Sequence, residues 1–486
     1  MIRPAVALCL LLMSACAVGP DYKPPVVPVP KQWSEADKNP HAAAATRPEQ
    51  WWQSFNDPIL NRLITDAIAA NLDLKQALVR VKDTRAQRWV TITAGLPSIT
   101  GQNNASRRYN NTSSPSAGST PSAGGGFGIG NQLINMFQLG LSVQWELDFF
   151  GGDRRAVEAA NATIDTEIEN SRNVLIILLG DVASHYIELR ANQQLIAITR
   201  ENLYSQQETV KLTQIRQQAG FASMLEVAQA QSQAATTEAL MPTYETLVKQ
   251  SIHALGVLLG REPGALALRL TEPGAIPAVS AIAIPDLPSE LLLRRPDIRH
   301  AERQLAVANA NIGVATAELY PKVNLSAFLG LQNTTIADFT PVGKSWSAAS
   351  SLTLPIFNWG KINANISSKK AQFDLAFLSY QSTVLNAFKE VEDALIAYSQ
   401  EQQRHKSLAQ AVAASRLTVQ LADERYHKGL TMFLDVLQTQ QTLYQTQRDL
   451  VDSDVKLSSD LVVLYKALGG GWQSVALVSD AVQLQK

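Results

Sequence analysis

Acidic side chains follow two glycines that each interrupt a long helical pattern. Glu226 comes soon after Gly220, and Asp435 comes at the same distance after Gly429. A carboxylate in the first turn of a helix is stabilised by the helix dipole. If several copies of the chain surrounded one axis, the Asp435 carboxylates would form a ring that favours cations. The two segments are therefore either ordinary helix ends or part of a charged rim.

One residue near the N-terminus could carry a covalent modification. A positive start and an apolar stretch over residues 5–13 precede Cys16, and the stretch is too short for an ordinary membrane-spanning helix. The end of this stretch resembles a bacterial lipoprotein signal. We therefore predict a signal peptide at residues 1–15 and an N-palmitoyl, S-diacylglycerol cysteine at Cys16. Ala17 after the cysteine fits lipoproteins sorted to the outer membrane; an ordinary export signal with a chance cysteine is the alternative.

Other chemistry finds little support in the sequence. Both cysteines, Cys9 and Cys16, lie in the first 16 residues, and the six histidines are scattered without metal-like pairing. His185 and His427 are expected to be solvated or interfacial helix residues. The formal net charge is -1, so the charge balance does not favour binding of nucleic acid. We predict no enzyme, no metal and no cofactor apart from the lipid on Cys16, and no nucleotide-driven step because a Walker motif is absent from the sequence.

Two long helical patterns must position the glycine segments. Apolar residues recur at helical spacing over about residues 153–219 and again over 361–427. Each pattern corresponds to a helix of ~100 Å at 1.5 Å per residue. A shorter helix follows each glycine, to about Leu259 and Leu468. The glycines are therefore predicted to be the tips of two helical hairpins.

Four short segments have the pattern of strands. Leu139, Leu141 and Val143 alternate with polar residues, and a strand of about ten residues with one apolar and one polar face is the unit of a membrane β-barrel. A half-buried strand of a soluble sheet has the same pattern. The predicted strands cover about residues 98–110, 138–148, 322–332 and 346–356.

The order of these elements predicts two similar halves. Each half has a leading helix, capped at Asn71 or opened by Pro296, then two strands, a very long helix and a shorter helix. No helix is expected before about Asp57. We predict a lipidated Pro-rich tether at residues 16–56, a first repeat at 57–262, a linker at 263–288, a second repeat at 289–471 and a C-terminal tail at 472–486.

Four strands cannot close a membrane barrel alone, because single-chain barrels begin at about eight strands. Three copies of the chain would supply twelve strands, and two copies would supply eight; cyclic symmetry is the natural arrangement. The helices are rich in Gln, Asn, Ala and Ser. This composition favours a hollow helical tube with a wetted inner face over a solid coiled coil.

Three segments resemble a known family: Cys16–Tyr22, Arg295–Ile298 and Arg425–Leu437 are similar to the outer-membrane efflux lipoproteins of the NodT branch, relatives of OprM and TolC. The resemblance implies an α+β membrane protein with TolC-like fold: a homotrimer with a 12-stranded outer-membrane β-barrel and a long periplasmic α-helical barrel. It implies a passive exit duct for drugs or other small molecules. The implied partners are a periplasmic adaptor (membrane fusion protein), an inner-membrane pump of the resistance-nodulation-division type and outer-membrane lipid.

The same resemblance suggests roles at the tips. Tyr426 and Asp435 match members of the TolC tip gate, whereas Thr431 and Gln438 stand where TolC has an arginine and a second aspartate. A hydrophobic constriction by Leu434 is the alternative gate. Gly220 and Gly429 are candidate adaptor-docking tips; the simpler interpretation is that both are ordinary helix-ending glycines.

Two other functions stay open from the sequence. A TolC-like duct can serve type I protein secretion instead of small-molecule efflux. A periplasmic coiled-coil scaffold without a pore is a further alternative, against which the alternating strands beside long helices argue.

Overall fold

The computed structural model describes residues 17–34, 48–110, 132–278, 290, 294–336 and 343–473. The chain forms two compact units. Unit 1 contains the N-terminal segment up to Lys23, together with Thr84–Thr163 and Leu305–Ala376. Unit 2 contains Pro24–Asp83, Ile164–Gln304 and Phe377–Lys486.

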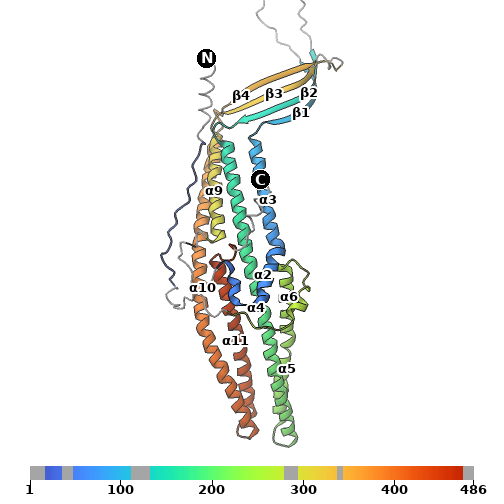
Figure 1. Ribbon diagram of the computed structural model, residues 1–486, viewed down its shortest axis with the longest axis vertical. Helices are drawn as coiled ribbons and strands as arrows, with labels where there is room; N and C mark the ends of the chain where they lie inside the picture. The colour runs from blue at the N-terminus through green and yellow to red at the C-terminus, as the bar shows by residue number, and fades with distance from the viewer. Residues whose placement is uncertain are drawn as a thin grey trace, which may run out of the picture. The chain divides into compact units, whose positions relative to one another are not determined.

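A four-stranded antiparallel sheet is the centre of unit 1 (Figure 1). Its strands lie in chain order, so each hydrogen-bonds to the next along the sequence. Within the described residues, the first and last strands are open edges with one neighbour each. The strands are β1 (Ser98–Asn110), β2 (Gln132–Leu147), β3 (Lys322–Asn333) and β4 (Lys344–Thr353).

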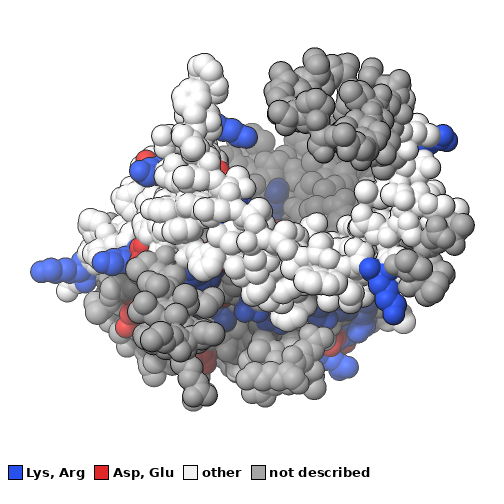
Figure 2. All heavy atoms as spheres, turned by 90° about the horizontal axis from the view of Figure 1, so that it is seen from above, with Lys and Arg blue, Asp and Glu red and all other residues white. Residues whose placement is uncertain are grey.

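The sheet presents apolar side chains to its surroundings. Leu141 is 52% exposed, and Trp346 is 76% exposed. Seen from above, the described surface is mostly uncharged, with Lys and Arg as scattered projections (Figure 2). Contiguous exposed apolar surface marks an interaction with membrane or protein. We therefore expect a membrane or another protein surface to pack against this sheet.

Two strand boundaries differ from the expectation. β2 begins at Gln132 rather than near residue 138, because its pairing with β1 continues to the Asn110↔Gln132 pair. β4 ends at Thr353 rather than near residue 356. Pro355 follows closely, and proline has no N–H to donate to a strand ladder.

Helices make up unit 2 and the rest of unit 1. Two of them, α4 (Gly152–Gln218) and α10 (Lys361–His427), contain 67 residues each. The predicted Asn71 cap is confirmed, since Asn71 Oδ1 accepts from the Leu74 amide at 2.8 Å. The other helices are α2 (Pro58–Ala70), α3 (Leu72–Ala94), α5 (Met224–Glu238), α6 (Met241–Leu258), α7 (Ala267–Leu270), α9 (Pro296–Ala317) and α11 (Phe433–Ala467).

The apolar core of unit 2 gathers side chains from many helices. Trp51 is buried and stacks on Tyr465, with ring centroids 5.5 Å apart. Leu63, Leu179 and Leu255 are fully buried in the same cluster. Because these residues come from distant parts of the sequence, this core fixes the helices of unit 2 against one another.

Two helical expectations were wrong. The 3₁₀ helix η2 (Pro48–Phe55) lies before Asp57, where no helix was expected; burial of Trp51 and Trp52 stabilises it. The single helix expected after Gly220 is two helices, α5 and α6. Pro242 lies at the start of α6, and its ring cannot continue an unbroken helix from the preceding turn.

Candidate functional site

The first hairpin tip joins α4 to α5 through Gly220. Gly220 has a φ of 76°, a conformation that glycine adopts without the cost of a Cβ. The Phe221 amide donates to the Arg216 carbonyl at 2.8 Å, and the Gly220 amide donates to the Gln217 carbonyl at 3.0 Å. These two bonds form a Schellman motif, which satisfies the last carbonyls of α4.

The start of α5 is capped by its own side chains. Ser223 Oγ accepts from the Glu226 amide at 3.3 Å, and the Glu226 carboxylate accepts from the Ser223 amide at 3.4 Å. This capping box satisfies free amides at the start of the helix. The first tip is thus stabilised largely within its own sequence.

The second hairpin tip joins α10 to α11 through Gly429, which has a φ of 72°. The Leu430 amide donates to the Arg425 carbonyl at 2.9 Å, so the same motif ends α10. The start of α11 differs, because Met432 occupies the cap position and has no side-chain oxygen to cap with. Thr431 Oγ1 instead donates to the Asp435 carboxylate.

Tyr426 connects the two tips, which lie at the same end of unit 2 (Figure 1). Its hydroxyl donates to Glu226 Oε2 at 3.1 Å, and its carbonyl accepts from Arg216 Nη1 at 3.1 Å. The Arg216 guanidinium also lies 4.7 Å from the centre of the Tyr426 ring, within cation–π range. These contacts therefore tie the second hairpin of the chain to its first.

Burial and charge act on the Tyr426 hydroxyl. Burial and the Glu226 carboxylate raise the pKa of Tyr426 to about 12, against the opposing effect of Arg216. The tyrosine is therefore a neutral donor to Glu226 at physiological pH. Phe433 packs beside it at 5.7 Å between ring centroids, within a small apolar cluster that includes Val436.

The structure separates the three gate candidates. Tyr426 is buried within the chain, whereas Leu434 and Asp435 are exposed at the start of α11. Asp435 contacts Thr431 and is not among the partners of Tyr426. The pairing of Tyr426 with Glu226 was not expected from the sequence; the only signal there is that both residues lie beside the matching tip glycines.

A polar seam lies between α4 and α11, on the side of the tips. Asn202 Nδ2 donates to Gln447 Oε1 at 2.9 Å, and the hydroxyls of Thr199 and Tyr444 lie 3.0 Å apart. Gln206, one turn further along α4, is buried, and neither of its amide atoms has a hydrogen-bond partner among the described residues. A buried polar atom without a hydrogen-bond partner costs free energy, so the seam is less stable at Gln206 than where its polar groups are paired.

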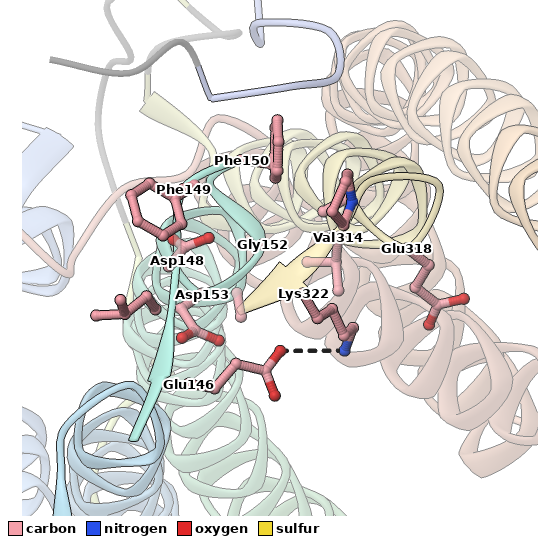
Figure 3. A pocket seen from close by; sticks show the side chains of 13 residues that line it. Glu146, Asp148, Phe149, Phe150, Gly152, Asp153, Val314, Glu318 and Lys322 are labelled. Atoms are coloured by element: carbon pink, nitrogen blue, oxygen red, sulfur yellow. Dashed lines mark ion pairs between the residues drawn. The ribbon is translucent and has the colours of Figure 1, made fainter. Parts of the chain in front are cut away.

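A small acidic cavity of about 160 Å³ lies in unit 1, where β2 passes into α4. Glu146 and Lys322 form an ion pair at 3.2 Å across it (Figure 3). Burial, Asp148 and Glu146 raise the pKa of Asp153. In the described part of the chain, no group of three or more His, Cys, Asp and Glu side chains could hold a metal ion.

Two residues singled out in the sequence have different outcomes. The lipidation candidate Cys16 lies outside the described residues. His185 pairs with Glu188 on the same helix at 3.1 Å.

Of the helices that the structure describes, none is both long and apolar enough to cross a membrane.

This chain combines two 67-residue helices with a four-stranded sheet, and the solved structures that it resembles are TolC-like outer-membrane channels. Among solved structures, the outer-membrane channel OprN matches with a TM-score of 0.85 at 33% identity, covering 94% of this chain and 100% of that chain. The open state of the Neisseria gonorrhoeae MtrE outer membrane channel matches with a TM-score of 0.78 at 26% identity, covering 94% of this chain and 99% of that chain.

Sequence comparison gives the family. The family model described as "Outer membrane efflux protein" matches residues 63–261 and 287–470. The chain therefore belongs to this family of outer-membrane transport proteins. Nodulation protein T of Rhizobium leguminosarum bv. trifolii is 31% identical over 479 residues, which are 96% of this chain and 97% of that protein. The solvent efflux pump outer membrane protein SrpC of Pseudomonas putida is 33% identical over 478 residues, which are 95% and 97% of the two chains.

Proposed function

We propose that three copies of this chain form the outer-membrane exit duct of a tripartite efflux system for drugs or other small molecules. The open edges of β1 and β4 carry this proposal. An unpaired strand edge cannot face lipid, and single-chain barrels need at least about eight strands. Threefold symmetry would pair each β4 with a neighbouring β1 and close a barrel of twelve strands.

The helices support a hollow periplasmic extension. The equal lengths of α4 and α10 and their matching tip motifs favour an internal two-fold repeat. Two such hairpins per chain would give six around a threefold axis, as a helical barrel requires. Transport through this duct is passive, and the energy comes from the inner-membrane pump.

Exposed apolar side chains at both tips favour docking of a periplasmic adaptor there. They surround Gly220 and Gly429 and would otherwise be left in water. Gly429→Asp should therefore abolish export while the protein remains at its normal level; unimpaired export would contradict docking at this tip. The exposed side chains are Phe221, Met224, Leu225, Leu430, Met432 and Leu434.

The exposed Asp435 fits a carboxylate ring at the closed tip, with the partly buried Tyr426–Glu226 contact holding each hairpin in place. Asp435→Ala should change single-channel conductance and its block by cations. If both stay as in the unaltered protein while Leu434→Ala opens the channel, the constriction is hydrophobic and the ring is absent.

The duct is anchored by lipid on Cys16, which the lipoprotein-like signal supports. More than one acyl chain is needed for stable anchoring. Metabolic labelling with radioactive palmitate tests this directly, and Cys16→Ser should remove the label.

The whole proposal is tested by deleting the gene and measuring drug susceptibility, with the mass of the purified complex measured in parallel. We expect increased susceptibility, restored by the intact gene, and a complex of three chains that conducts in planar bilayers. Unchanged susceptibility with the loss of a secreted protein would indicate type I secretion instead. A chain that neither conducts nor assembles would contradict a channel of any kind.

A further inference from the structure

A cavity of about 490 Å³ lies within unit 2, where the start of α2 and the middle of α4 meet the segment that follows α7. Cavities of this size commonly hold small molecules in other proteins, at about 300–1,000 Å³. Most of its wall is apolar. The apolar part includes Phe55, Pro58, Ile59, Pro273, Ile276 and Pro277.

Arg190 of α4 lines this cavity and is only 3% exposed, and we call the space the Arg190 cavity. Arg190 Nε donates to the Tyr186 hydroxyl at 3.1 Å. Arg190 Nη1 donates to Gln193 Oε1 at 2.8 Å and to the Glu272 carbonyl at 2.6 Å. The remaining nitrogen, Nη2, has no partner among the residues that the structure describes. One edge of the guanidinium is therefore bonded to the protein, and Nη2 is left for a ligand.

The other two buried arginines in the described ranges each pair with a carboxylate. Arg155 contacts Asp21 at 2.8 Å, and Arg295 contacts Glu390 at 2.7 Å. Arg190 forms no ion pair with any described residue. A buried charge without a counter-charge is strongly unfavourable, so an anion at Arg190 would stabilise this part of the chain.

The neighbouring side chains do not provide that anion directly. Burial and the Asp57 carboxylate raise the pKa of Tyr186 to about 12, so its hydroxyl stays protonated at physiological pH and donates to Asp57 Oδ2 at 2.7 Å. Asp57 Oδ1 accepts from the Ile59 and Leu60 amides and caps α2. The Asp57 charge therefore acts on Arg190 only through the Tyr186 hydroxyl.

The orientation of the guanidinium is fixed before any ligand binds. Its Cζ lies 5.0 Å from the centre of the Tyr186 ring, within cation–π range. A Cβ added to Gly274 would lie 2.8 Å from the same Cζ, so the main chain of the segment after α7 packs directly on the guanidinium. A donor that is already oriented loses little freedom on binding, and affinity is higher as a result.

We propose that the Arg190 cavity binds a small monocarboxylate with an apolar body, and that Arg190 Nη2 donates to its carboxylate. Arginine favours carboxylates and phosphates because its planar donors match their oxygens. Asp57 and Glu272 also line the cavity, and their charges oppose a doubly charged phosphate more than a singly charged carboxylate. The apolar wall fits the body of the ligand. The carboxylate can belong to a free organic acid or to the end of a short peptide.

Titration of the purified full-length protein tests this site without any transport measurement. Isothermal titration calorimetry, in a chloride buffer free of other carboxylates, compares benzoate with benzamide, which has the same ring and no charge. We expect benzoate to bind at least about tenfold more tightly, because a hydrogen bond to a charged group is stronger than one to a neutral group. Equal affinities, or no binding of any carboxylate, would overturn the proposal.

Arg190→Lys tests the donor itself. Lysine keeps the charge but lacks the planar set of donors, and we expect it to weaken benzoate binding by about tenfold. Arg200→Lys is the matched control, because Arg200 is an exposed arginine of the same helix; it should leave the affinity unchanged. Unchanged binding in a folded Arg190→Lys protein would overturn the role of Arg190.

Filling the cavity provides an independent test that leaves Arg190 intact. Ala275 is exposed and lines the cavity, so Ala275→Trp should fold and should block benzoate. Ala265→Trp is the control, because Ala265 is exposed in the same connecting segment and lies outside the lining. Benzoate binding that survives Ala275→Trp would place the ligand elsewhere and overturn the proposal.

Two further ligands determine the source and the class of the anion. Tighter binding of N-acetyl-alanyl-alanine than of its C-terminal amide and of benzoate would support the end of a peptide, whereas tighter binding of benzoate would support a free acid. Tighter binding of inorganic phosphate than of both carboxylates would overturn the carboxylate class. None of these results depends on drug export, so a failed titration leaves the proposed duct untouched, and a failed export assay leaves the cavity untouched.

Discussion

The two hairpin tips end their long helices in the same way but begin their short helices differently. Gly220 and Gly429 each close a Schellman motif with a positive φ. At the first tip, Ser223 caps α5 locally. At the second tip, Met432 provides no cap, and the start of α11 is instead stabilised by the buried Phe433. The start of α5 is therefore stabilised by local sequence, and the start of α11 by tertiary contact.

The largest difference between the tips should come from removing Tyr426. Tyr426→Ala removes a buried ring and should destabilise the second tip by about 3 kcal/mol, as is typical of aromatic-to-alanine changes. Gln217→Ala is the control, because Gln217 lies at the same distance before Gly220 and is only half-buried. Hydrogen exchange of the tip amides measures the loss of stability in each of the two variants. Similar losses of protection in the two variants would show that the tips do not differ in this way.

Substitution of the tip glycines should affect both tips to a similar extent. Gly220→Val and Gly429→Val force a β-branched residue into the left-handed region, at a cost of about 1–2 kcal/mol each. A Cβ added to either glycine would meet no described atom within 4 Å, so backbone conformation alone decides the cost. Thermal unfolding followed by circular dichroism measures it. A much larger effect at one glycine would mean that its tip makes contacts beyond the Schellman motif.

Much of this asymmetry was out of reach of the sequence. The spacing of Gly220 and Gly429 predicted both turns, because helix-ending glycines are a local feature. The contact between Tyr426 and Glu226 joins residues about two hundred positions apart in the chain, and no local pattern encodes it. Apolar periodicity also hides local breaks, as at Pro242, which divides the helix that was expected to be continuous.

The sheet illustrates the same limit. Strict alternation predicted the centre of β2, from Leu139 to Leu147, while its beginning at Gln132 depends on pairing with β1. The contacts between Arg155 and the N-terminal segment were missed for a related reason. Arg155 looks like any surface residue of an amphipathic helix, and its burial becomes visible only when the carbonyls of Val18 and Gly19 are beside it.

The hydroxyl of Tyr426 should contribute less than its ring. Tyr426→Phe removes the bond to Glu226 and should cost about 1 kcal/mol at neutral pH. The pKa of Tyr426 is raised to about 12, so folding favours the neutral phenol. Its contribution is complete below the ordinary tyrosine pKa of about 10 and is lost as the pH rises through about 12.

The stability difference between the unaltered protein and Tyr426→Phe should therefore shrink between about pH 10 and pH 12. Other buried tyrosines, such as Tyr186, titrate in both proteins and cancel in the comparison. Exchange protection of the tip amides, measured across this range, follows the difference. A difference that is constant with pH would mean that the hydroxyl–carboxylate contact does not stabilise the tip.

Substituting the residues at the two capping positions should give the smallest effect, and it tests the difference between the two tips most directly. Ser223→Ala should destabilise the first tip by about 1 kcal/mol, the usual value of a lost N-cap. Met432→Ser should stabilise the second tip by about 0.5–1 kcal/mol, because the backbone of Met432 is already extended, at φ -82° and ψ 158°, as a capping residue requires. In the double variant, hydrogen exchange should show that the start of α11 is locally more stable than the start of α5. If Met432→Ser also reduces opening of the channel in planar bilayers, the absence of a cap at the second tip is what allows that tip to open. If opening is unchanged although the tip amides are better protected from hydrogen exchange, the stability of the tip does not control its gating.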